Sequence, residues 1–231
     1  AETAHRYMLG LYSVLEEIIT AFPNILFEGC SGGGGRFDAG MMYYFNQYWT
    51  SDDTDAAERM YIQHGTSLVM PSAFMGSHIS AVPNHQVGRI SPLKTRGYIA
   101  MCGQFGYELD VTKMTADELN EIKEQIEVYK SVREVIHNGD MYRLASPFES
   151  RNAAWEYVAE DKKTVVMFFF TVMTAPSQQM KYIKLDGLCA DKPYRLRGTD
   201  EIYGGDVLMN RGICLADECD CGGQMLVFDL V

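Results

Sequence analysis

Strand-like and helix-like segments alternate four times over the first 138 residues of this 231-residue chain. Four short apolar runs have the length and composition of buried strands, and they lie at residues 25–30, 46–51, 72–79 and 105–110. Longer segments with helical periodicity lie around these runs. Such alternation is typical of a parallel sheet whose strands are joined by helices. The first 138 residues are therefore predicted to form an α/β unit.

The helices of this unit are predicted from apolar spacing and from end signals. The clearest one begins at a capping box, in which Thr115 is followed three residues later by Glu118, and it ends at Asn138-Gly139. A second helix is expected to be capped near Asp53 or Thr54. The predicted helices cover residues 7–22, from Asp53 or Thr54 toward 69, 93–102 and 115–138.

The composition changes after Gly139. The segment 164–174, with the sequence TVVMFFFTVMT, is strongly β-prone, and turn signals separate it from shorter β-prone runs at 182–185, 194–196 and 225–230. This pattern indicates an antiparallel β-sandwich. We therefore expect two domains, at residues 1–138 and 139–231.

The α/β unit has too few strands to be a closed barrel. A (β/α)8 barrel takes about 250 residues, and four strands are half of its sheet. We expect the unit to be the C-terminal half of such a barrel, with the other strands upstream. A chain that starts at Ala1 within a helical pattern is in keeping with a fragment or a processed product.

Composition argues against several partners. A formal charge of −11 repels phosphate backbones, so nucleic acid is not expected to bind. The sequence lacks a run of about 18 uncharged apolar residues, so a membrane span is not expected either. Six cysteines without a compact scaffold spacing favour a reducing, cytoplasmic location.

Metal and cofactor signals are weak. His78 and His85 are seven residues apart without a third ligand, and hydrogen-bonded structural histidines explain them better. A cluster of three thiols near the end has only the distant Cys189 as a fourth ligand, so unpaired thiols are favoured over zinc; the three are Cys214, Cys219 and Cys221. We expect no metal and no cofactor.

Three segments at strand ends are candidates for chemistry. The first, CSGGGGRFD at 30–38, is either a flexible loop or a loop that lets a ligand approach the backbone, and it lacks the ending of a phosphate loop. The second, WTSDDTDA at 49–56, is either an acidic helix start or a catalytic site, in which Asp52 reacts and Trp49 forms part of a sugar-stacking wall. The third, MGSHISAVPNHQ at 75–86, carries the two histidines.

These segments together resemble family thirty-six of the glycoside hydrolases, the bacterial and fungal α-galactosidases. The resemblance runs in order from residue 1 to about 138, and its motifs are CSGGGGRFDAG, QYWTSDDTDA, GSHISAVPNHQVGR and KTRGYIAMCGQFGYELD. Beyond residue 138 it rests on a strand-rich tail of suitable length.

The resemblance implies a retaining hydrolysis of terminal α-galactosyl units in sugars such as melibiose or raffinose. It makes Asp52 the acid/base, and it places Cys30 and Gly32 against the galactose. Asp53 is left with a capping role only. The family's nucleophile is an aspartate in a Lys-Trp-Asp-like motif, which this sequence lacks, and Asp38 does not match that motif. The nucleophile is therefore expected upstream, and the chain alone is expected to be inactive.

Two other functions stay open at this point. A raffinose or stachyose synthase would transfer the galactosyl unit to a sugar hydroxyl instead of water. A non-catalytic carbohydrate-binding module would use the rim without reaction, although Asp52 at the end of a barrel strand argues against it. The resemblance also implies that the full-length protein is a homo-oligomer, namely a tetramer.

Overall fold

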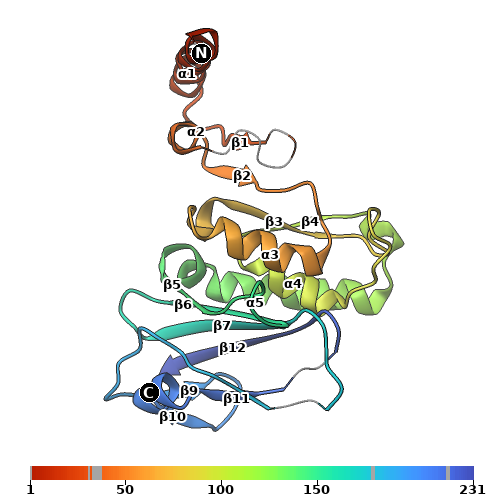
Figure 1. Ribbon diagram of the computed structural model, residues 1–231, viewed down its shortest axis with the longest axis vertical. Coiled ribbons are helices and arrows are strands. Elements are labelled where there is room, and N and C mark those ends of the chain that lie inside the picture. Colours follow the sequence, from red (N-terminus) through yellow and green to blue (C-terminus); the bar gives the residue numbers. More distant parts are fainter. Residues whose placement is uncertain (1, 31, 33–37, 178–179, 217–218) are drawn as a thin grey trace.

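The computed structural model describes residues 2–30, 32, 38–177, 180–216 and 219–231. A helical and parallel-sheet part comes first along the chain, and a part made of antiparallel sheets follows it (Figure 1). The predicted fold class, half of a (β/α)8 barrel followed by an antiparallel β part, is confirmed. None of the helices among these residues is long and apolar enough to cross a bilayer.

The first part contains one parallel sheet with its strands in chain order, β1-β2-β3-β4. This order is that of consecutive strands in a (β/α)8 barrel, because each right-handed crossover adds the next strand beside the last. The elements are α1 (Glu2–Ala21), β1 (Glu28–Gly29), α2 (Ala39–Tyr44), β2 (Gln47–Trp49), α3 (Ala56–Thr66), β3 (Met75–Ser80), α4 (Leu93–Met101), β4 (Gln104–Glu108) and α5 (Ala116–Asn138), with 3-10 turns at Ser72–Phe74 and Val111–Lys113.

The four strands are found near their predicted places but are shorter. The first was predicted over residues 25–30, whereas β1 holds only Glu28 and Gly29. Leu26 is 84% exposed, so the apolar run that suggested a longer strand is not buried here. Helix α2 was not predicted, and it begins where the Asp38 carboxylate accepts the N–H of Met41 at 2.9 Å.

Helix α5 confirms the predicted capping box. The Thr115 hydroxyl accepts the N–H of Glu118, and the Glu118 carboxylate accepts the N–H of Thr115 at 2.8 Å. The buried residues of the helix include Ile122, Tyr129 and Val132, which lie on the predicted apolar stripe. Local end signals and periodicity were sufficient to predict this helix because both are encoded within it.

The second part contains a six-stranded antiparallel sheet of order β10-β9-β12-β7-β6-β5 and a two-stranded sheet, β11-β8. Strands β5, β6, β10 and β11 were not predicted. Every residue of β6 is buried, so its sequence shows no polar–apolar alternation. The elements are β5 (Asp140–Ala145), β6 (Asn152–Val158), β7 (Thr164–Thr171), β8 (Lys181–Ile183), β9 (Pro193–Leu196), β10 (Ile202–Gly204), α6 (Gly205–Asn210), β11 (Ile213–Leu215) and β12 (Gly222–Leu230).

Helices α4 and α5 belong to the cores of both parts. On one side, Leu93, Ala100 and Ile122 pack with Ile79 of the parallel sheet. On the other, residues of the same two helices pack with Trp155, Phe168 and other large side chains of the six-stranded sheet. The helices therefore form a layer between the two sheets (Figure 1). The antiparallel part braces the helices that support strands β3 and β4.

Candidate active site

The carboxyl ends of the parallel strands bring the candidate residues to one edge of the sheet. Cys30 and Gly32 follow β1, Trp49 ends β2, and Asp52 lies three residues beyond it. His78 lies within β3, and Glu108 ends β4. In a parallel sheet all these ends face the same way, so the residues share the rim at which barrel enzymes bind and react.

Trp49 and Asp52 are in direct contact. The indole Nε1–H of Trp49 donates to Oδ1 of Asp52 at 3.1 Å, and the Asp52 side chain is exposed to solvent. This hydrogen bond ties the orientation of the carboxyl group to that of the indole. The sequence indicated that both residues belong to the rim, but it gave no sign that they bond to each other.

The Trp49 ring is itself held by two neighbours. It stacks on the imidazole of His78 with 4.9 Å between ring centroids and 25° between planes. The guanidinium carbon of Arg59 lies 4.9 Å from the centroid of the indole, within cation–π range. Trp49 is therefore fixed by residues from β3 and α3 as well as by its own strand.

Arg59 is a buried cation that supports the rim from below. Its Nη2 donates to the carbonyl of Gly76 at 2.8 Å, and its Nη1 donates to the carbonyl of Ser51 at 3.4 Å. Burial lowers the pKa of the Arg59 guanidinium to about 10, so it still carries its charge at neutral pH. Sequence reasoning missed Arg59, because its contacts with two backbone carbonyls and with the Trp49 ring come from other elements and leave no motif.

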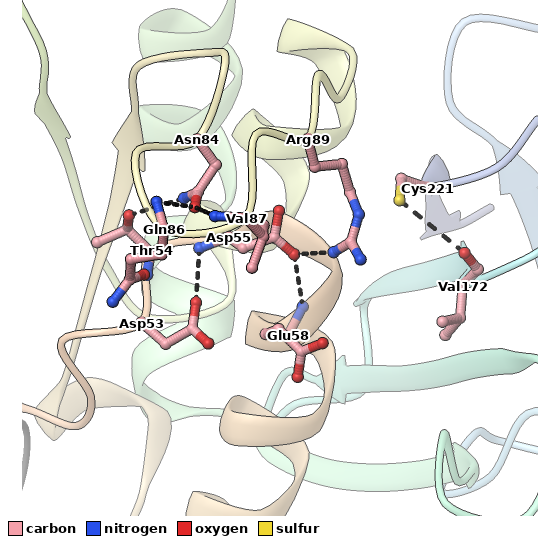
Figure 2. Close-up of polar contacts among 10 residues, drawn as sticks. All are labelled: Asp53, Thr54, Asp55, Glu58, Asn84, Gln86, Val87, Arg89, Val172 and Cys221. Atoms are coloured by element: carbon pink, nitrogen blue, oxygen red, sulfur yellow. Dashed lines mark hydrogen bonds and ion pairs between the residues drawn. The ribbon is translucent and has the colours of Figure 1, made fainter.

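The cap of α3 is Asp55, and the prediction of a cap at Asp53 or Thr54 is wrong. The Asp55 carboxylate accepts the N–H of Glu58 at 3.2 Å and forms an ion pair with Arg89 (Figure 2). The helix begins at Ala56, so Asp53 is too early to reach its free N–H groups. Asp53 instead accepts the N–H of Asp55 at 3.0 Å and closes the turn before the helix.

The two histidines have separate surroundings. His78 Nδ1 lies 3.6 Å from the Glu108 carboxylate, in addition to its stacking on Trp49. His85 is exposed in the loop that follows β3. Among the residues that the structure describes, no group of three His, Cys, Asp or Glu side chains is arranged to hold a metal ion.

The loop after β1 is only partly described, at Cys30 and Gly32. Cys30 is exposed and has a free thiol. Gly32 has a φ of +59°, in the left-handed region, and a Cβ there would meet open space. The left-handed backbone is a physical reason for glycine at this position, because a side chain would add strain. The other glycines of the loop lie outside the described residues.

The six cysteines carry free thiols. Of the three near the end of the chain, Cys219 is exposed, Cys214 is half-buried and Cys221 is buried. Burial raises the pKa of the Cys221 thiol, which keeps it protonated at neutral pH.

Comparison with known proteins gives matches over both parts. The family model described as Melibiase matches residues 1–139, and the model described as Glycosyl hydrolase family 36 C-terminal domain matches residues 152–228. The chain is 54% identical to Alpha-galactosidase AgaA of Geobacillus stearothermophilus over 93% of its length, and 49% identical to Alpha-galactosidase Mel36A of Lactobacillus acidophilus over 91%. It spans 29% of the length of each of these relatives.

A solved structure of the AgaA enzyme in complex with raffinose matches with a TM-score of 0.97 and 51% identity. The match covers 100% of this chain and 32% of that one. The galactosidase domain of AgaSK, an alpha-galactosidase-sucrose kinase, matches with a TM-score of 0.95 and 41% identity over 98% of this chain and 32% of that domain's chain. The family and the fold thus extend over the whole chain.

Proposed function

The chain belongs to the melibiase family, whose model matches residues 1–139, and from this membership we propose that it supplies the acid/base side of a retaining α-galactosidase active site. The observation that carries the proposal is the position of Asp52. It follows a parallel strand at the carboxyl-end rim, and its carboxyl group is exposed and held by the indole of Trp49. Relatives at 54% and 49% identity are named alpha-galactosidases.

In the first half of the proposed reaction, a carboxylate outside this chain attacks the anomeric carbon of the galactosyl unit. The Asp52 carboxyl group donates its proton to the glycosidic oxygen, the bond from that oxygen to the anomeric carbon breaks, and the remainder of the sugar leaves as an alcohol. In the second half, the Asp52 carboxylate accepts a proton from water while that water attacks the anomeric carbon. The bond from the anomeric carbon to the carboxylate outside this chain breaks, galactose leaves, and both carboxyl groups return to their starting states.

Trp49 supports both halves of this cycle by orientation. Its indole N–H donates to Oδ1 of Asp52 at 3.1 Å and so holds the carboxyl group in one direction at the rim. The exposed remainder of the half-buried Trp49 ring lines the sugar pocket in our proposal, in keeping with its place at the rim.

The proposed substrates are oligosaccharides with a terminal α-galactosyl unit. The support is that solved relatives are complexes with raffinose and with stachyose. The test is the reaction of the full-length protein with raffinose, followed by proton NMR from the first minutes. Double displacement predicts that galactose is released first as its α-anomer.

Each other outcome of this test identifies another reaction. Early release of the β-anomer would mean a single displacement and would contradict the retaining mechanism. Transfer of the galactosyl unit to a second sugar, in place of free galactose, would favour the synthase-like alternative. A protein that binds raffinose without any turnover would favour a non-catalytic binding role.

Cys30 and Gly32 are proposed to contact the galactosyl unit, because they follow β1 beside the strand that leads to Asp52. Cys30 is an exposed free thiol and so can react with a thiol reagent. In the full-length protein, bound galactose is expected to slow the labelling of Cys30 at least several-fold, as measured by peptide mass spectrometry. The exposed Cys219 is the internal control. Equal labelling of Cys30 with and without galactose would contradict the contact.

The remaining parts of the proposal concern the whole protein. We propose that the catalytic half-barrel and the β-sandwich domain divide near residue 139, where the first family-model match ends and before the second begins at residue 152. A cytoplasmic location is proposed from the six free thiols. A tetramer is proposed for the full-length protein, and sedimentation velocity of that protein would test it.

A further inference from the structure

The loop after β3 folds back as a closed turn over residues 84–89. The Asn84 N–H donates to the carbonyl of Arg89 at 2.8 Å, and the Gly88 N–H donates to the carbonyl of Asn84 at 2.8 Å. The Asn84 side chain is buried, and its Oδ1 accepts the N–H groups of Gln86 and Val87 at 2.9 and 3.1 Å (Figure 2). The turn is thus internally bonded and can act as a rigid support. We refer to it as the 84–89 turn.

The 84–89 turn bonds to the residues that follow Asp52. Asn84 Nδ2 donates to the Thr54 hydroxyl at 3.1 Å, and Arg89 forms an ion pair with the buried Asp55. Asp55 in turn caps α3. These contacts link the turn to the start of a helix that is packed in the core.

Gln86 makes the contact nearest to the acid/base residue. Its side-chain Nε2 donates to the carbonyl of Asp52 at 3.3 Å, and its Oε1 accepts the N–H of Thr54 at 3.4 Å. One side-chain amide therefore bonds the backbone on both sides of Asp53. A primary amide matches this pair of backbone groups, because it has a donor and an acceptor at the same end.

We infer that Gln86 is a positioning residue for the acid/base step, acting by fixing the backbone of residues 52–54. Trp49, at the end of β2, donates to the Asp52 carboxyl group. Gln86, in the loop after β3, donates to the backbone carbonyl of Asp52. Both bonds constrain where the carboxyl group can lie relative to the glycosidic oxygen. Proton donation is sensitive to this placement, because a shift of about 1 Å can cost roughly 100-fold in rate.

This inference rests on the proposed function. A positioning role for Gln86 differs from a purely structural role in how its loss affects different substrates. If Gln86 positions the acid, its loss should slow galactosyl-enzyme formation from substrates that need a proton on the leaving oxygen, and should spare that step for substrates that do not. Raffinose has a sugar alkoxide as its leaving group and needs the proton. An activated aryl α-galactoside has a good leaving group and does not.

The test compares the full-length protein with its Gln86→Met variant, which keeps the length of the side chain and removes both amide hydrogen bonds. We expect kcat/KM on raffinose to fall about 10- to 100-fold, while kcat/KM on the aryl galactoside, which depends only on steps up to formation of the galactosyl-enzyme, changes less than about threefold. Val87→Ala is the matched control, because Val87 lies in the same turn with an exposed side chain. It should behave as the parent does.

Thermal unfolding of each variant shows whether folding is intact. The Thr54→Val variant disrupts a different contact between the 84–89 turn and residues 52–54. It removes the acceptor for Asn84 Nδ2 and should lower kcat/KM on raffinose in the same selective way. Equal losses on the two substrates in both variants, or no loss in either, would overturn the role of Gln86 while leaving the α-galactosidase proposal intact. A parent protein that cleaves neither substrate would overturn both.

Discussion

Replacing Asp52 by alanine in the full-length protein is expected to lower kcat/KM on raffinose by about 100- to 10,000-fold, the range of general acid–base catalysis. The loss should be far smaller for formation of the galactosyl-enzyme from an activated aryl α-galactoside, because that leaving group departs without a proton. Steady-state and single-turnover kinetics on the two substrates would measure the difference. The difference between substrates identifies the acid, since a general loss of folding would affect both.

Asp53 provides a matched control one residue away. Its carboxylate accepts the N–H of Asp55 within the turn, which is a local structural bond. Asp53→Asn keeps an oxygen acceptor in the same position, so activity on both substrates should stay within a few-fold of the parent. Unchanged cleavage of raffinose by the Asp52→Ala variant would exclude Asp52 as the acid/base. The same substrate-selective loss in Asp53→Asn would transfer the role to Asp53.

The sequence was sufficient to predict features that are encoded locally. The capping box of Thr115 and Glu118 lies within four residues, and the structure contains it as predicted. The alternation of strands and helices predicted the parallel sheet, and the ends of its strands predicted the rim that holds Trp49 and Asp52. Each of these features depends on residues close together in the chain.

Features that depend on contacts between distant segments could not be predicted in this way. Three neighbouring residues could each have capped α3, and the structure uses Asp55, which also forms an ion pair with Arg89 from 34 residues away. Gln86 is likewise 34 residues from Asp52. Sequence patterns report spacing along one element, whereas these contacts need the positions of two elements in space.

The apolar surface of the first part leads to a prediction about residues 1–231 alone. Several large apolar side chains of α1 and the segment before β1 are more than half exposed, and these are Tyr7, Leu9, Val14, Phe22, Ile25 and Leu26. Fully burying one such side chain is worth about 1.5–3 kcal/mol. Covering the set would contribute roughly as much as the total stability of a domain, about 5–15 kcal/mol.

The parallel sheet adds a second reason for association. In the described sheet, β1 and β4 are edge strands, each bonded to one neighbour. In a closed barrel both edges would be paired, so here their free backbone groups can bond to another chain. The exposed side chains and the open edges lie in the same part of the molecule, which favours association through that part.

Expressed alone, residues 1–231 are therefore expected to form species heavier than the 26.0 kDa of one chain, or to unfold at low denaturant concentration. They are also expected to show no turnover of an activated aryl α-galactoside, because Asp52 without a nucleophile cannot complete a double displacement. Light scattering, denaturant titration and a sensitive release assay would measure the three properties. Leu26→Ser is an informative variant, since it should reduce association without affecting the antiparallel part. A stable 26.0 kDa monomer with clear turnover would contradict this prediction, because its activity would require a nucleophile within residues 1–231.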